Sequence, residues 1–493
     1  MSNLDEQLAT GALRPQLKLL NDTQLKEIHE AALQILDQTG MTIHLPEAVE
    51  LLREHGAKIE GEDRVRIPPA MVEKALKDVQ GPITLHDRNG NPKMYLKDQN
   101  SYYGPGPTIQ YVYDIYTGER RASDKEDIER AARLCDYLPN IDFVMTMGMT
   151  GGVNPKAKGL NPAVTDRHDF VNMLKNTCKP LFFSCWTKEG IEDIWKIAVA
   201  VKGSEAVLEK EPFMVLFTQP ISPLLIGEHP LQQMLFCAEK KIPFIFGSAP
   251  LSGATAPNTI AGSVALSLAE VLGGLVIAQC KQPGSPFIMG AGYGPMDFRK
   301  GSSPYNGPEY YLSKIINKEL SAYYNIPDWS YGGVTDSKML DVQGASEASL
   351  SLFNSTLIGS NLIHDVGYME MGMTACLESV VLGNELIGSF KYYLKGVPVN
   401  AESLALEMID RIGPGGNYLA EKHTVKHLKD IWHPELFDRG NYDQWEKAGK
   451  KPLEVKLSEK AQWIIENHQP EPLAPEVEKV IDEIIHQAGK NSE

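Results

Sequence analysis

Short apolar runs and helix-length segments alternate eight times along this chain, and this rhythm restricts its fold more than any other feature. Each run is rich in β-branched and aromatic residues, and each is followed by an amphipathic segment. The apolar runs are residues 108–113, 141–149, 180–186, 213–218, 242–247, 286–290, 329–333 and 362–367. The helical segments after them are residues 124–137, 166–177, 188–201, 229–240, 259–279, 308–324, 342–358 and 374–394.

Eight strand-and-helix repeats are typical of an α/β fold of the (β/α)8 TIM barrel type, and a doubly wound open sheet is the alternative. We expect the barrel to span residues 101–395. Residues 1–100 mix helical patterns with short strand-like runs, which predicts a small α+β N-terminal region. Residues 396–493 are polar and helical, and we expect a C-terminal helical cap and tail that packs across the barrel or against a neighbouring molecule.

Composition and charge argue against several classes of protein. Hydrophobic residues make up 42% of the 493 residues, which is enough for a large core. The net charge of −16 is spread along the chain, so we expect no binding to nucleic acid or to an anionic membrane. The first residues lack a secretion signal, and the most apolar region, residues 260–280, contains Glu270 and many small residues, so we expect no membrane span. Six scattered cysteines without a CxxC pair indicate reduced thiols in a cytoplasmic protein and argue against a zinc site.

In a parallel barrel the ligand binds where the strands end and the following loops begin. In this sequence those positions are rich in glycine, which lets a ligand approach the backbone closely, and in aromatic residues. We predict that the substrate is bound by Trp186, Phe217, Tyr293, Trp329, Tyr331 and Tyr368. Several aromatic faces together form a site for a permanent cation, although each ring alone could simply pack in the core. The sequence therefore predicts a pocket for a small quaternary ammonium compound.

Polar residues near the same strand ends are candidates for the rest of the site. Asp336 and Asp365 are the nearby carboxylates, and Arg299 follows a glycine-rich segment, where it could pair with a substrate carboxylate. His364 ends a strand, so it either holds the substrate carboxylate or is a core histidine with satisfied hydrogen bonds. We predict positioning roles for Asp336 and His364, substrate binding by Arg299, and no acid or base catalyst.

Several motifs resemble the trimethylamine methyltransferase family in their order and spacing, over nearly the whole chain. They include YVYD at 111–114, TGERR at 117–121, NTCKP at 176–180, QPG at 282–284, DSK at 336–338 and GPGG at 413–416. The resemblance implies a (β/α)8 barrel that transfers a methyl group from an amine to the cobalt of a separate corrinoid protein. Founding members of the family contain pyrrolysine, whereas this chain contains only the twenty standard residues.

The absence of pyrrolysine in a chain that resembles this family implies a quaternary amine as substrate, because its leaving group is already a neutral amine. Relatives without pyrrolysine act on glycine betaine, proline betaine, carnitine or γ-butyrobetaine. We favour glycine betaine, with dimethylglycine as the product. The resemblance also implies that a cognate corrinoid protein carries cobalamin as the methyl acceptor and that this chain binds no cofactor tightly. The outer helices of the barrel and the helical tail favour a homo-oligomer, and the resemblance suggests a trimer or hexamer.

Two other functions stay open at this point. One is a barrel lyase or decarboxylase that uses Asp336 and His364 as acid and base, which would give a bell-shaped pH profile without any corrinoid protein. The other is a cytoplasmic betaine-binding protein without catalysis.

Overall fold

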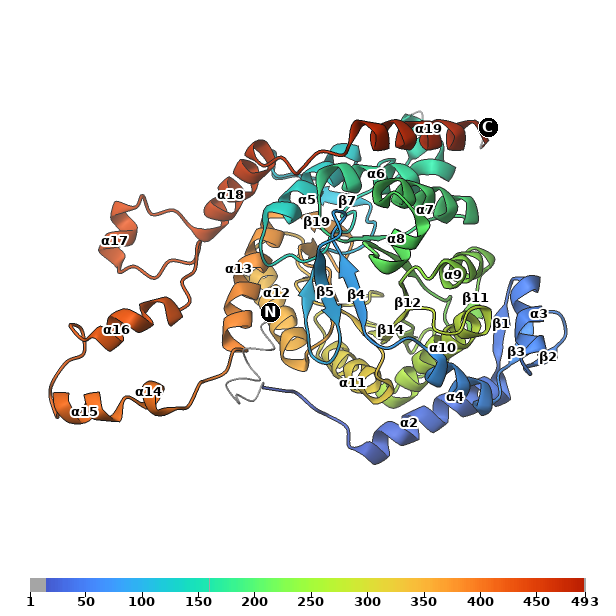
Figure 1. Ribbon diagram of the computed structural model, residues 1–493, viewed down its shortest axis with the longest axis horizontal. Helices are drawn as coiled ribbons and strands as arrows, with labels where there is room; N and C mark the ends of the chain where they lie inside the picture. The colour runs from blue at the N-terminus through green and yellow to red at the C-terminus, as the bar shows by residue number, and fades with distance from the viewer. Residues whose placement is uncertain (1–14, 159, 492–493) are drawn as a thin grey trace.

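A computed structural model describes residues 15–158 and 160–491 of the chain, and its centre is a closed barrel of parallel strands (Figure 1). The named strands of the barrel are β6 (Tyr102–Tyr103), β9 (Leu181–Phe183), β10 (Met214–Thr218), β12 (Phe244–Ser248), β14 (Phe287–Ala291), β16 (Trp329–Tyr331) and β17 (Leu362–His364). The segment around Val144 fills the place between β6 and β9 through a parallel bridge to Leu181. A second parallel bridge, from Met289 to Asp328, joins β14 to β16, and β17 pairs with β6 to close the ring. The predicted (β/α)8 barrel is confirmed.

The first barrel strand differs from the predicted one. Residues 108–113 were expected to form it, but β7 (Tyr111–Tyr113) belongs to a separate four-stranded sheet. The other strands of that sheet are β8 (Arg120–Ala122), β18 (Tyr368–Met369) and β19 (Thr374–Cys376). The barrel strand is β6 instead, which has only two residues and is followed by a Gly-Pro-Gly-Pro sequence. Two residues cannot show a strand's alternation of side chains, so the sequence pattern did not reveal β6.

Helices surround the barrel close to the positions that the sequence predicts (Figure 1). They are α5 (Lys125–Tyr137), α6 (Thr165–Asn176), α7 (Lys188–Lys202), α8 (Glu205–Lys210), α9 (Glu228–Lys240), α10 (Ile260–Lys281), α11 (Pro308–Tyr324), α12 (Val342–Ile358) and α13 (Leu377–Tyr393). Local chemistry sets their starts: Asp124 caps α5, Thr187 caps α7 and Asp341 caps α12, each accepting hydrogen bonds from backbone N–H groups of the first turn. Pro308 begins α11, where its fixed φ angle suits the first helical position.

The N-terminal region packs beside the barrel and also closes the end at which the barrel strands begin. Its first part consists of α2 (Asp22–Gln34), β1 (Met41–Ile43), α3 (Pro46–Glu54), β2 (Lys58–Glu60), β3 (Arg64–Arg66) and α4 (Pro69–Asp78). The hairpin of β4 (Ile83–His86) and β5 (Pro92–Leu96) follows, and its buried residues share one apolar cluster with barrel side chains such as Phe182 and Ile245. Side chains therefore fill the barrel below the carboxyl ends of its strands.

The helix α10 is, among the described residues, the one that is long and apolar enough to cross a membrane. However, 83% of its most apolar window is buried inside the protein. It packs against α2 and α4 on one side and against the barrel strands β12 and β14 on the other. These contacts account for its apolar sequence as that of a core helix.

The C-terminal part divides into an extended segment and two packed helices (Figure 1). The extended segment carries α14 (Ala401–Leu404), α15 (Leu406–Ile412), α16 (Lys422–His427) and α17 (Tyr442–Lys447). The helix α18 (Leu453–Asn467) packs on α13 and α5, and α19 (Pro475–Asn491) packs on α7 and α6. After the extended segment, the chain therefore packs on the barrel helices again through α18 and α19.

Candidate active site

A cavity of about 470 Å³ opens at the carboxyl ends of the barrel strands. This volume lies in the range of about 300–1,000 Å³ that small-molecule sites occupy. Six of the predicted site residues line it, namely Trp186, Phe217, Trp329, Tyr331, His364 and Tyr368. Asp365, Ser248 and the glycines Gly247 and Gly290 also contribute to its wall. The strand ends thus come together around one cavity, and seven of the 26 residues that line it are Trp, Tyr or Phe.

Three other predicted residues lie outside this lining. Tyr293 is buried and lines a separate, smaller cavity, and its hydroxyl donates to the Glu309 carbonyl at 2.8 Å. Arg299 is exposed on a turn, where its backbone N–H donates to Asp297. Asp336 accepts the backbone N–H of Tyr305 at 2.8 Å and so anchors a residue that does line the cavity. The substrate-binding and positioning roles of these three residues stay predictions.

Trp329 lies at the centre of the aromatic lining. Its ring stacks on that of His364 with a centroid separation of 4.0 Å and an interplanar angle of 7°, and Phe217 lies 5.8 Å away. Gly247 and Gly290 meet the edge of the indole: a Cβ atom added at Gly290 would lie 3.5 Å from Trp329 Cδ1 and only 3.1 Å from the Gly247 Cα. Glycine at these strand ends therefore lets neighbouring strands and the indole approach closely.

Three tyrosines form a second part of the wall. The rings of Tyr305, Tyr310 and Tyr331 lie 4.3–5.4 Å apart, and the Tyr331 hydroxyl donates to the Tyr305 carbonyl. Burial raises the pKa of each of these phenols, and the charge of Asp365 raises those of Tyr305 and Tyr310 further. The phenols therefore stay neutral at physiological pH. Tyr305 and Tyr310 were not predicted, because they come from the start of α11 and the loop before it rather than from a strand end.

The helix α11 also supplies polar residues that the sequence analysis missed. Lys314 is buried, lines the cavity and donates to the Tyr331 carbonyl, the Ser351 carbonyl and the Ser355 hydroxyl at 2.9–3.2 Å. Its removal from water lowers its pKa well below the usual value. Asn317 accepts the backbone N–H of Ala291 and donates to the Trp329 carbonyl, so α11 holds the ends of β14 and β16. The spacing of these polar residues by three or four positions places them on one helix face, and this was the available signal.

Two buried carboxylates are close to the cavity, and both already accept hydrogen bonds from the protein. Asp365 lies 2.6 Å from His364 Nδ1, and its φ of 71° places it in the left-handed region that residues other than glycine rarely adopt. Glu270 comes from the apolar helix α10 and accepts the hydroxyls of Ser248 and Ser222. It also accepts the Leu224 backbone N–H at 2.7 Å, and burial raises its pKa.

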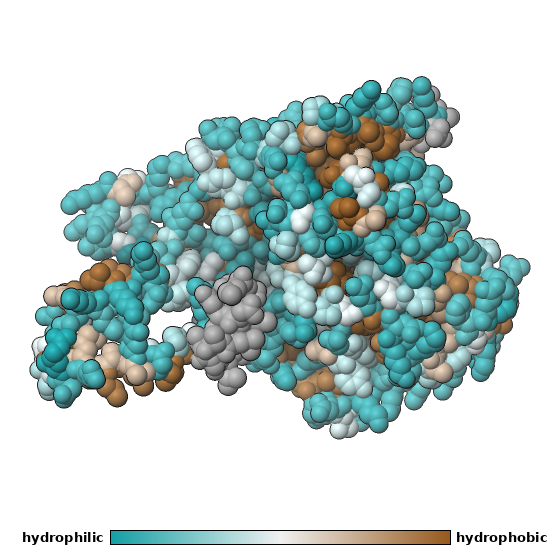
Figure 2. All heavy atoms as spheres, viewed as in Figure 1, coloured by the Kyte–Doolittle hydropathy of each residue, from teal (hydrophilic) through white to brown (hydrophobic). Residues whose placement is uncertain are grey.

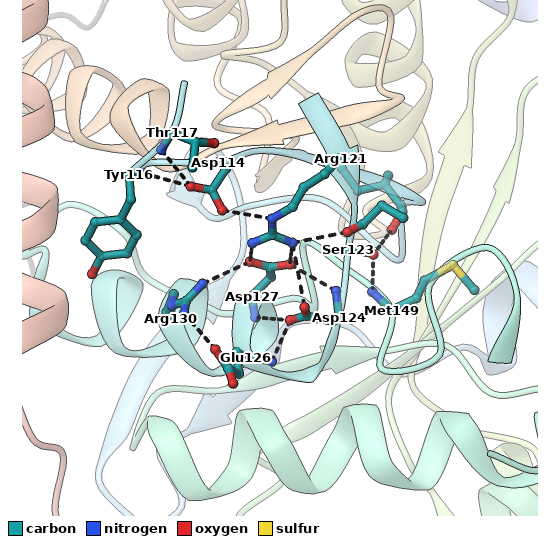
Figure 3. Close-up of polar contacts among 12 residues, drawn as sticks. Asp114, Tyr116, Thr117, Arg121, Ser123, Asp124, Glu126, Asp127, Arg130 and Met149 are labelled. Carbon is teal, nitrogen blue, oxygen red and sulfur yellow. Dashed lines mark hydrogen bonds and ion pairs between the residues drawn. The ribbon is translucent and has the colours of Figure 1, made fainter. Parts of the chain in front are cut away.

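A charged cluster beside the cavity fixes two of its lining segments (Figure 3). Arg121 donates two hydrogen bonds to Asp127 and one to Asp114, which ties the β7–β8 turn to the start of α5. Burial alone would raise the pKa of Asp114, but two backbone N–H groups and the Arg121 guanidinium together hold it at about 2. Two residues along from Arg121, Ser123 donates to the Ile109 carbonyl and accepts the Met149 backbone N–H. Since Ile109 and Met149 line the cavity, this cluster supports one side of its opening.

The sequence matches the family model for trimethylamine methyltransferase (MTTB) over residues 5–492. The chain belongs to this family of methyltransferases. It is 31% identical to a glycine betaine methyltransferase from Desulfitobacterium hafniense strain Y51, over 97% of this chain and 99% of the relative. It is 30% identical to the trimethylamine methyltransferase MttB of Desulfitobacterium hafniense strain DSM 10664 / DCB-2, over 99% of this chain and 98% of that relative.

A solved structure shares the fold of the chain. The crystal structure of the Methanosarcina barkeri monomethylamine methyltransferase (MtmB) aligns with a TM-score of 0.52 and 10% sequence identity. The alignment covers 100% of this chain and 92% of that chain. At this low identity the likeness concerns the fold alone, and the choice of substrate has to be argued from the cavity.

Proposed function

We propose that this protein transfers a methyl group from a quaternary ammonium compound, with glycine betaine as the first candidate, to cobalamin carried by a separate corrinoid protein. The observation that carries the proposal is the aromatic lining of the cavity at the barrel mouth, centred on Trp329 and Tyr331. The 31% identity to a glycine betaine methyltransferase along nearly the whole chain supports this choice of substrate.

The cation would be held by ring faces rather than by an ion pair. A quaternary ammonium group cannot donate a hydrogen bond, so it gains most from the negative faces of aromatic rings, among which indole binds most strongly. Trp329, Phe217 and Tyr331 supply such rings, and the raised pKa of Tyr331 keeps its ring neutral. A neutral trimethylalkyl group of the same shape would lack this attraction.

The carboxylate of a betaine would need a donor on the same wall, and His364 is the best placed one. Its Nδ1–H faces the Asp365 carboxylate, so Nε2 donates to a substrate carboxylate when the ring is the doubly protonated imidazolium. Its ring also stacks on Trp329, which holds the imidazole beside the proposed cation site. This pairing would place the two ends of a betaine on two adjacent side chains.

The chemistry asks for positioning rather than for proton transfer. The bond between nitrogen and one methyl carbon breaks, its electron pair stays on nitrogen, and a neutral tertiary amine leaves. The reduced cobalt of the partner supplies the electron pair that forms the new bond to the methyl carbon. The barrel would contribute by orienting one methyl group toward the opening and by excluding water around the cation. No residue is therefore assigned as an acid or a base.

The test is a methyl-transfer assay with the purified chain, glycine betaine and Co(I) cobalamin, in which the methylcobalamin spectrum is followed over time. We expect methylcobalamin to appear and dimethylglycine to accumulate in equal amount. Proline betaine, carnitine, γ-butyrobetaine and trimethylamine complete the substrate series. No transfer from any compound would overturn the proposal, and transfer from trimethylamine alone would reject the quaternary substrate. Consumption of a betaine without cobalamin would favour the lyase instead.

A further inference from the structure

Lys314 occupies an unusual place for a charged residue. Charged and other hydrophilic residues normally lie on the surface, and they cover most of the face that Figure 2 shows. Lys314 is instead only 3% exposed and forms part of the wall of the cavity at the barrel mouth. Among the described residues that line this cavity, it is the one lysine or arginine, and Asp365 is the one carboxylate. The charge of Lys314 therefore bears directly on what the cavity can bind.

The hydrogen bonds of Lys314 indicate that its side chain is an ammonium. Its Nζ donates to the Tyr331 carbonyl, the Ser351 carbonyl and the Ser355 hydroxyl at 2.9–3.2 Å. An ammonium has three N–H bonds and no acceptor, which matches three acceptors, whereas a neutral amine would turn its lone pair toward one of these oxygens. Burial lowers the pKa of Lys314, and the charge of Asp365 raises it in part. The three hydrogen bonds favour the charged form in the same way.

Lys318, one turn further along α11, shows how a buried lysine is usually compensated. Its Nζ lies 2.9 Å from the carboxylate of Asp328, so the positive charge meets a negative one in direct contact. Buried charges generally need such a partner, because their removal from water is costly. The three acceptors of Lys314 are two carbonyls and a hydroxyl, none of which carries a charge. The protein therefore satisfies the hydrogen bonds of Lys314 but leaves its charge without a contacting counter-charge.

Asp365 acts on Lys314 through its charge alone, because its carboxylate is engaged by His364 Nδ1 at 2.6 Å. When His364 is the imidazolium that donates to a substrate carboxylate, the charges of His364 and Asp365 cancel. The wall then keeps one net positive charge, that of Lys314. A ligand with a carboxylate compensates this charge, whereas a purely cationic ligand adds a second positive charge to the cavity.

The position of Lys314 also indicates how a zwitterion would be oriented. Its Nζ lies 4.2 Å from the centre of the Tyr331 ring and 4.8 Å from the centre of the Tyr311 ring. A ring that already holds a cation attracts a second cation less, because the two positive charges repel each other across it. A trimethylammonium group is therefore expected to lie toward Trp329 and Phe217, with the carboxylate on the side of Tyr331 and His364.

We propose that Lys314 selects substrates that carry a carboxylate beside the quaternary nitrogen and rejects quaternary cations without one. This inference rests on the proposed function and specifies the substrate class further. All N–H bonds of the ammonium are taken by the protein, so Lys314 attracts the carboxylate through space and leaves direct contact to His364. In a site with little water, unit charges several ångströms apart interact much more strongly than they do in bulk water.

The first experiment compares the binding of glycine betaine and choline by titration calorimetry. Both ligands have a trimethylammonium group, but choline carries a hydroxymethyl group where glycine betaine has its carboxylate. Lys314→Met should weaken the binding of glycine betaine and strengthen that of choline, and the ratio of the two dissociation constants should change by about tenfold or more. The Tyr331 carbonyl keeps a donor in this variant, because it also accepts the Ser355 hydroxyl at 2.6 Å.

Opposite changes for the two ligands cannot come from a damaged fold, which would weaken both. Equal changes for both ligands, or an unchanged ratio, would overturn the role of Lys314 while methyl transfer from glycine betaine by the natural protein still supported the proposed function. Failure of the natural protein to bind either ligand would overturn both proposals.

A second pair of variants keeps Lys314 in place and changes only the charge beside it. Ser355 is fully buried, and its hydroxyl lies 2.9 Å from Lys314 Nζ. Ser355→Asp places a carboxylate against the ammonium, and Ser355→Asn places an uncharged group of the same size there. The aspartate variant should shift the ratio of dissociation constants in the same direction as Lys314→Met, and the asparagine variant should shift it much less. Equal shifts in the two variants would refute a role for charge, and this pair decides the question even where Lys314→Met does not fold.

Discussion

Replacing Trp329 with leucine tests the proposed cation wall directly. Trp329 is buried, with its ring stacked on His364 and close to Phe217, so a cation over its indole face would be largely removed from water. A cation–π contact contributes about 0.5–1 kcal/mol at an exposed site and about 2 kcal/mol when desolvated. We therefore expect Trp329→Leu to weaken glycine betaine binding by about 1–2 kcal/mol, or about 5–30-fold in Kd.

Charge has to be separated from packing, because leucine also changes the shape of the wall. Titration calorimetry with 3,3-dimethylbutanoate, in which carbon replaces the cationic nitrogen, gives the necessary comparison. The natural protein should bind glycine betaine more tightly than this isostere, which keeps the carboxylate but lacks the positive charge. The leucine variant should lose about 1–2 kcal/mol of that preference, which is the coupling energy of a double-mutant cycle between side chain and ligand charge.

Tyr293→Leu is the matched control, because Tyr293 is also a buried aromatic residue after a barrel strand but lies outside the cavity lining. It should destabilise the fold and leave the preference for the charged ligand unchanged. Thermal unfolding of both variants shows whether enough folded protein remains for titration. An unchanged preference in Trp329→Leu would refute the cation wall, as would an equal loss in Tyr293→Leu.

Three further predictions concern buried carboxylates. Burial raises the pKa of Asp169 from 3.8 to about 7. The free energy of unfolding should therefore be highest below about pH 4, where Asp169 is protonated in both the folded and the unfolded chain, and should fall by on the order of 4 kcal/mol as the pH rises to about 7. Urea unfolding across this range should show the decline, and Asp169→Asn should remove it. The pKa of Asp114 is held at about 2, so its contribution is present above about pH 4 and is lost toward pH 2; Arg121→Gln should shift the acid-unfolding midpoint to higher pH. Glu270→Gln should lower the free energy of unfolding by about 1–3 kcal/mol, because an amide cannot accept all three hydrogen bonds that reach this carboxylate. Urea unfolding at neutral pH measures this loss of stability.

The sequence predicted the helices better than the strands, for a physical reason. Each barrel helix buries one face over several turns, so its apolar spacing repeats, and residues such as Asp124 and Thr187 mark where it begins. Most barrel strands were also detected, since runs such as residues 213–218 are continuously buried. The two-residue strand β6 had no period to detect, and the more regular run nearby forms β7 in another sheet.

The rule that barrel sites lie at the strand ends located the cavity and residues such as Tyr331 and His364, which end β16 and β17. Trp329 begins β16, and its ring lines the cavity from the apolar cluster inside the barrel. The rule could not locate Tyr310 or Lys314, because both lie on the helix α11 rather than at a strand end. The apolar spacing of this helix indicates only a face that packs on the barrel. Tyr293 shows the converse: it follows β14 closely, but its hydroxyl bonds to the Glu309 carbonyl at the start of α11 rather than turning toward the opening. The direction of a loop side chain depends on tertiary contacts that strand position does not encode.

The balance of charge around the cavity bears on why rings rather than carboxylates would hold the substrate. In the proposed transfer the positive charge leaves nitrogen as the methyl group departs, so any group that binds the cation strongly stabilises the ground state more than the transition state. A free buried carboxylate would do this most. Both nearby carboxylates are already engaged, Asp365 with His364 and Glu270 with two serine hydroxyls and a backbone N–H. The cation would then be bound by the uncharged rings of Trp329 and its neighbours. Their attraction is strong enough to select a quaternary amine, but it is weaker than that of a carboxylate and so opposes the loss of positive charge from nitrogen less.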